Sequence, residues 1–167
     1  KALGAQPASA RWHTNIGVQY FFLGDDSLAS MWERKALTLD RDFFFPAVVL
    51  TYIDLYAKNF DSARVRIAQV LKTAKDEPDA FGAAGDVELI AGNFEKALPH
   101  YQRAVELTAP RSDWGVKLAF ALLRLGKRAE AERLIKANIS STGEDLNRIT
   151  EGASAYYTAA AYCIDQN

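Results

Sequence analysis

The sequence predicts an all-α fold in which antiparallel helix pairs stack into an α-solenoid, and three observations lead to this prediction. A period of 34 residues holds without an insertion across four units. Alanine recurs at that spacing, at Ala29, Ala63, Ala97 and Ala131. Alternating β-branched stretches and hairpin-type Asn-Gly or Asp-Gly pairs are missing. A helix pair cannot bury its apolar face alone, so repeated pairs are expected to stack.

Each unit is predicted to contain two helices joined by a tight turn. In the third unit the pattern places a first amphipathic helix at 79–91 and a second at about 95–107. Asp25 and Asn93 follow the turns of their units and are suited to cap the second helix. Glycine ends a first helix well because it adopts left-handed backbone without strain. The turn positions are Gly24, Lys58, Gly92 and Gly126.

The prolines fit the same organisation. Pro46, Pro78 and Pro110 fall near the junctions between units, whereas Pro99 is expected inside a helix. The segment starting at Lys1 aligns with the one starting at Lys35, which suggests the end of an upstream second helix. The predicted organisation begins with the end of an upstream second helix at 1–9. Four repeats follow, at 10–43, 44–77, 78–111 and 112–144. A C-terminal helix at 145–167 either caps the array or begins an incomplete fifth repeat.

The third unit resembles a tetratricopeptide repeat (TPR) almost throughout. The resemblance is carried there by Gly85, Gly92, Ala97, Tyr101 and Ala104, and in the first unit by Gly17, Tyr20, Gly24, Ala29 and Ala36. Glu33, Thr51 and Asn138 depart from the family pattern, Glu33 standing where the family has a bulky apolar residue. The resemblance implies a right-handed superhelix whose concave wall is made by the first helices of the repeats.

The resemblance also implies which residues face inward on that wall. The N-terminal half of the wall is apolar and aromatic, which suits a bound peptide or helix anchored by apolar side chains. For Tyr52 and Tyr56, packing within the array is an equally open interpretation, and for Phe43, Phe44 and Phe45 it is the favoured one. The predicted groove residues are Arg11, Asn15, Val18, Phe22, Phe45, Val49, Tyr52, Tyr56, Asp86, Lys117, Phe120 and Arg124.

One family specialisation is not expected in this chain. Chaperone-binding members grip a C-terminal carboxylate with a clamp of Lys, Asn and Arg side chains. The corresponding positions here are Thr14, Val18, Val49, Asp79 and Ala83, none of which has the required type. Asp79 would repel a carboxylate. A carboxylate-clamp co-chaperone is therefore disfavoured.

Catalytic, metal and cofactor roles are not expected. His13 and His100 lie at non-equivalent positions of different units, and Cys163 is the single cysteine. The net charge of −1 gives no reason to expect a nucleic-acid partner, and no apolar run approaches the ~18 residues of a membrane-spanning helix. The predicted chain is a non-enzyme without cofactor, nucleic-acid partner or membrane insertion.

Two functions from different classes follow. The first is a protein-interaction scaffold that binds a peptide or helix segment in the concave groove. The second is a regulatory or sensory module of a larger enzyme or transcription regulator, a fusion that the resemblance implies is frequent in bacteria. Self-association through uncapped ends is a third, weaker hypothesis. Between compartments, the cytoplasm is slightly favoured over the periplasm.

Overall fold

The computed structural model describes residues 9–108 and 113–140, and within these ranges every regular element is an α-helix. The prediction of an all-α fold is therefore confirmed. The elements are α1 Ala10–Phe22, α2 Asp26–Leu39, α3 Phe45–Tyr56, α4 Phe60–Thr73, α5 Pro78–Ile90, α6 Phe94–Leu107, α7 Asp113–Arg124 and α8 Arg128–Ser140.

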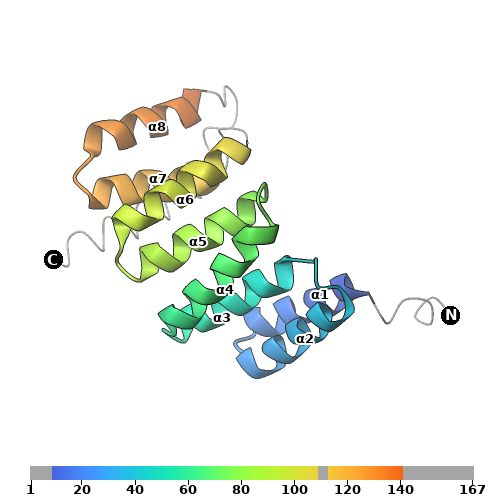
Figure 1. Cartoon of the computed structure of the whole chain (residues 1–167). Coiled ribbons are helices and arrows are strands. Elements are labelled where there is room, and N and C mark those ends of the chain that lie inside the picture. Colours follow the sequence, from blue (N-terminus) through green and yellow to red (C-terminus); the bar gives the residue numbers. More distant parts are fainter. Residues whose placement is uncertain (1–8, 109–112, 141–167) are drawn as a thin grey trace.

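The helices pack in consecutive pairs that stack into a solenoid (Figure 1). The pairs are α1–α2, α3–α4, α5–α6 and α7–α8, and the second helix of each packs against the first helix of the next. The helices α1 and α8 lie at opposite ends of this array (Figure 1). We propose that each pair is one repeat. The predicted helices at 1–9 and 145–167, together with Pro110 and Cys163, fall outside the described residues, save for Ser9.

The turn between paired helices adopts the left-handed backbone that its sequence predicts. Gly24, Gly92 and Gly126 have φ between 72° and 79°, and Lys58 adopts φ 60° at the equivalent position. Lysine reaches this conformation at a cost of about 1–2 kcal/mol. The capping prediction holds at one site, because the Asp25 side chain accepts from the backbone N–H of Leu28 at 2.9 Å.

Asn93, the other predicted cap, does something different. It makes no side-chain cap hydrogen bond. Its side-chain amide instead donates to Oε2 of Glu88 at 2.8 Å, across the turn. Glu88 also receives two hydrogen bonds from Arg64 of α4, from Nε at 2.9 Å and from Nη2 at 3.1 Å. Burial raises the pKa of Glu88, but these donors outweigh it and hold the pKa below its ordinary value.

Small residues set how closely the helices approach. The alanine column Ala29, Ala63, Ala97 and Ala131 is fully buried in the second helices. On the first helix of the third pair, a Cβ added to Gly85 would lie 2.5 Å from the Tyr101 ring. The ring of Tyr101 therefore packs directly on the backbone of α5, and no other residue type fits at position 85 without a shift of the ring.

The first pair uses a different partner at the same place. Gly17 and Glu33 occupy the repeat positions of Gly85 and Tyr101, and the Glu33 carboxyl lies against Gly17. Glu33 is fully buried. Within the described residues, neither carboxyl oxygen has a hydrogen-bond partner, and the nearby hydroxyl of Thr14 has none either. Burial raises the pKa of Glu33 to about 8, and the neighbouring Thr14 offsets this only in part.

This buried acid makes a testable prediction about stability. The folded pKa exceeds the unfolded one, so the contribution of this group to stability is greatest below about pH 5, falls between about pH 5 and 8, and levels off above pH 8. Replacing Glu33 by Met keeps the side-chain length and removes the unsatisfied oxygens. We expect Glu33→Met to raise the free energy of unfolding by about 1–3 kcal/mol at neutral pH, and by more above pH 8.

Urea unfolding followed by circular dichroism at several pH values checks this expectation. Glu106→Met, at an exposed position of α6, is the matched control and should leave the loss of stability between about pH 5 and 8 in place. A loss over this pH range that persists unchanged in Glu33→Met would contradict the assignment to Glu33.

Candidate protein-binding surface

One buried carboxylate joins three of the four helix pairs. Asp86 of α5 accepts a hydrogen bond from the hydroxyl of Tyr52 in α3 at 2.7 Å and another from Tyr101 in α6 at 2.6 Å. The ammonium group of Lys117 in α7 lies 2.8 Å and 2.7 Å from its two oxygens. Asp86 is buried and the Lys117 side chain is 21% exposed, so this charge pair is only partly shielded from water.

The neighbouring hydroxyl and ammonium groups act as donors toward Asp86. Burial, and then the charge of Asp86, raise the pKa of Tyr52 well above its usual range, so its hydroxyl keeps the proton that it donates. Lys117 also lies 4.7 Å from the centroid of the Trp114 ring, a cation–π contact on its own helix. A Cβ on Gly82 of α5 would overlap the Trp114 ring, so this ring packs directly on the α5 backbone.

Four of the twelve predicted groove residues are therefore committed to the fold. Asp86, Lys117 and Tyr52 belong to the buried network, and Val49 is a core residue packed with Leu50 and Ile53. Val49 is buried in a cluster that also contains Ala29 of the preceding pair, and its place on the groove stays a prediction. The missed signal was the 34-residue spacing of Tyr52 and Asp86, which places a hydroxyl and a carboxylate in adjacent repeats at one position.

Other predicted groove residues are partly exposed. Val18, Phe45 and Phe120 are half-buried, and the first two pack against the core around Val49. Phe45 also contacts Phe43 and Phe44, with ring centroids 6.5 Å and 6.4 Å apart. Arg11 and Asn15 are exposed, and the Arg11 guanidinium lies 5.8 Å from the centroid of the Phe43 ring.

Three exposed apolar residues form a column at the last turn of the first helices, two of them from the predicted groove and the third Ile90. We call Phe22, Tyr56 and Ile90 the apolar ladder, since they occupy the same position in three successive pairs. Their exposed fractions are 77%, 62% and 49%. Arg124 holds this position in α7, with its guanidinium 4.8 Å from the centroid of the Phe94 ring.

Aromatic contacts connect the ladder to the buried network. Phe21 lies 5.8 Å from both Phe22 and Tyr56, measured between ring centroids. Tyr56 in turn stacks with Tyr52 at 6.3 Å, and Tyr52 reaches Asp86. A continuous strip of side chains thus runs from α1 through α3 to α5. Its inner edge, at Tyr52 and Asp86, is held by hydrogen bonds, and its outer edge, the apolar ladder, is exposed to solvent.

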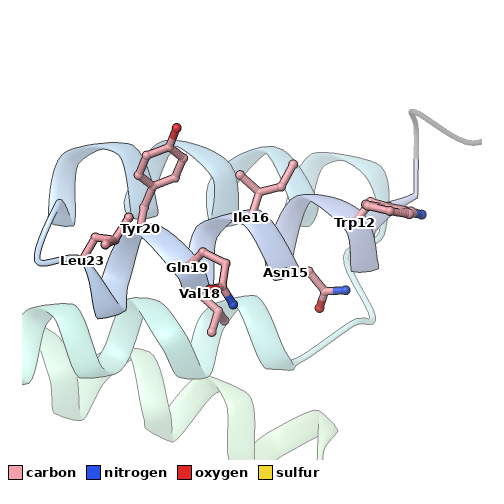
Figure 2. Close-up of a pocket in the computed structure, with 7 residues that line it drawn as sticks. All are labelled: Trp12, Asn15, Ile16, Val18, Gln19, Tyr20 and Leu23. Atoms are coloured by element: carbon pink, nitrogen blue, oxygen red, sulfur yellow. The ribbon is translucent and has the colours of Figure 1, made fainter. Parts of the chain in front are cut away.

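A pocket of about 600 Å³ lies along α1 (Figure 2). Its lining includes Asn15 and Val18 of the predicted groove. Trp12 and Ile16, also in the lining, share repeat positions with Pro46 and Leu50 of α3, which are buried where α2 packs on α3. The pocket therefore has the character of a helix-packing face. The remaining lining residues are Gln19, Tyr20 and Leu23.

The two histidines lie apart and do not form a site. His13 is buried, with Nδ1 3.0 Å from the carbonyl oxygen of Ser9 and its ring 5.4 Å from that of Trp32. His100 is half-buried on α6, and burial lowers its pKa. Within 9–108 and 113–140, no three His, Cys, Asp or Glu side chains are grouped to hold a metal ion. No helix in this part of the chain is long and apolar enough to cross a bilayer.

The fold and the repeated side-chain columns define an all-helical solenoid of the TPR-like class. Solved structures with this fold include MamA from Desulfovibrio magneticus RS-1 (residue 41 to the end), with a TM-score of 0.68 and 19% identity over 84% of this chain and 80% of that one. Two further MamA structures give TM-scores of 0.67 and 0.65, at 19% and 17% identity, and cover 83% and 90% of this chain and 81% and 79% of theirs. At such identities the similarity shows the fold. No protein-family model and no curated protein matches the sequence.

The Asp86 network gives a prediction about stability. Asp86→Ala leaves the Lys117 ammonium and the hydroxyls of Tyr52 and Tyr101 without their shared acceptor. We expect a loss of about 3–5 kcal/mol in the free energy of unfolding, because an unpaired buried charge is costly. Urea denaturation monitored by circular dichroism measures it.

The matched control is Asp76→Ala. Asp76 also pairs with a cation, Arg103 at 3.3 Å, but its side chain is exposed. This variant should lose less than about 1 kcal/mol. Equal losses in the two variants would show that Asp86 is not a structural hub.

Proposed function

We propose that this chain is a protein-interaction scaffold that binds an extended or helical segment of another protein along the apolar ladder. The observation that carries the proposal is the recurrence of Phe22, Tyr56 and Ile90, exposed at one repeat position in three successive pairs. Large apolar side chains that stay exposed in register offer a partner several anchor points in a row.

The surroundings of the ladder support binding without rearrangement. The side chains beneath it are held by the Asp86 network and by the ring contacts of Phe21 and Tyr52. A surface that is already fixed loses little conformational entropy when a partner docks. The fold of the chain, shared with MamA, supplies the stacked first helices from which such a surface is built.

The exposed columns of the molecule allow a matched test. Tyr56 and Ile90 are exposed by 62% and 49%, and Val65 and Met31 have the same two values on the second helices. Val65 and Met31 also share one repeat position. The ladder variant Tyr56→Ser with Ile90→Ser can therefore be compared with the control variant Val65→Ser with Met31→Ser.

We expect peptides selected from a random display library on the wild-type chain to bind the ladder variant at least about tenfold more weakly, since each exposed anchor contributes about 1 kcal/mol or more. The control variant should bind as the wild type does. Fluorescence anisotropy gives the dissociation constants, and circular dichroism verifies that both variants fold. Loss of binding in the control variant alone would place the partner on the second helices and refute the proposal. So would a library that yields no binding peptide.

A further inference from the structure

The ladder changes character in the last described pair, and this change indicates the chemistry of the partner. Phe22, Tyr56 and Ile90 are followed at the same offset by Arg124 in α7. A segment lying along the ladder would therefore meet apolar side chains over three pairs and then a cation. This step rests on the proposed function, because it concerns the same surface.

Arg124 is held in place but not neutralised. Its guanidinium lies over the Phe94 ring, 4.8 Å from the centroid, and it forms no ion pair with any carboxylate in the described part of the chain. A cation–π contact does not supply acceptors for all five guanidinium N–H donors, so donors remain available to a partner. Lys117, two turns earlier on the same face of α7, contrasts with it, because both oxygens of Asp86 bind its ammonium group.

We propose that the bound segment carries apolar side chains for the ladder and an acidic side chain, Asp or Glu, that pairs with Arg124. A planar, pre-oriented guanidinium is suited to a carboxylate, which it binds through two parallel hydrogen bonds. The hydrophobic wall beside it lowers the local dielectric and strengthens the pairing.

The repeat geometry sets the spacing of these groups in the partner. Packed helices lie roughly 8–10 Å apart, and an extended chain advances about 3.3 Å per residue. Since α3 and α5 contact each other, an extended partner moves about three residues between Tyr56 and Ile90. The acidic side chain is expected beyond the apolar anchor at Ile90, toward α7.

The experiment uses a phage library of random peptides about ten residues long, fused through their C-termini so that no terminal carboxylate is free. Peptides are selected on the whole chain and, in parallel, on Arg124→Gln and Arg34→Gln. Arg34 is an exposed arginine of α2, away from the ladder, and serves as the matched control. An enriched peptide and its amide counterpart, with Gln in place of the acid, are then titrated by fluorescence anisotropy as C-terminal amides.

We expect wild-type selection to enrich an acidic residue to one side of the apolar anchors. Arg124→Gln should weaken the acidic peptide about 10- to 100-fold and leave the amide counterpart nearly unaffected. The two changes should thus be non-additive, as they are for groups in contact. Arg34→Gln should change neither affinity, and added salt should reduce the effect of Arg124.

Two different failures are distinguishable. Peptides that depend on Tyr56 and Ile90 but show no acidic preference, or equal sensitivity to Arg34→Gln and Arg124→Gln, would overturn the pairing with Arg124 and leave the scaffold proposal standing. Binding that ignores the ladder variant would overturn the scaffold proposal itself, and the pairing with it.

Discussion

The helix pairs of a solenoid must keep fixed positions relative to one another. In this chain the carboxylate of Asp86 contributes to this by joining three of the pairs. Asp86 receives donors from α3, α6 and α7, so three helix pairs share one acceptor. Apolar contacts alone permit small sliding between stacked pairs, because they have no direction. A buried carboxylate with four close donor contacts has a narrow geometric optimum, and it therefore defines the register of the pairs as well as joining them.

This constraint also explains how the surface divides into fixed and open parts. Side chains of the buried network, such as Tyr52 and Lys117, have their polar groups satisfied within the molecule. One turn further along the first helices, Phe22 and Tyr56 have no comparable cover. The hydrogen-bonded edge holds the exposed edge in place. This is the arrangement expected of a binding surface that is preorganised before the partner binds.

The architecture could be predicted from the sequence because each repeat shows the same local structural requirements. A left-handed turn at one position, a small residue at a second and an apolar stripe between them are local properties that spacing reveals.

The surface was less predictable. Periodicity placed Val49 and Tyr56 on the same wall, yet Val49 is buried by the preceding pair and Tyr56 is open. Which of two inward residues is covered depends on side chains from a neighbouring pair, and a 34-residue pattern does not contain that information. The hydrogen bonds of Asp86 were not predicted for the same reason, since its donors lie 15, 31 and 34 residues away in the sequence.

The buried Glu33 has a consequence for how the array comes apart. In a linear stack, each pair has its own stability and a coupling to its neighbours. The first pair contains an unsatisfied acid in its interior, and in the described part of the chain no ion pair links it to the second pair. The second and third pairs are coupled by Arg64 with Glu88, and the third and fourth by Lys117 with Asp86. We expect the first pair to open more readily than the second and third pairs, and amide hydrogen exchange there to report a smaller cooperative unit. Because the cost of the buried acid grows as pH rises from about 5 to 8, raising the pH through this range widens the difference between the first pair and its neighbours.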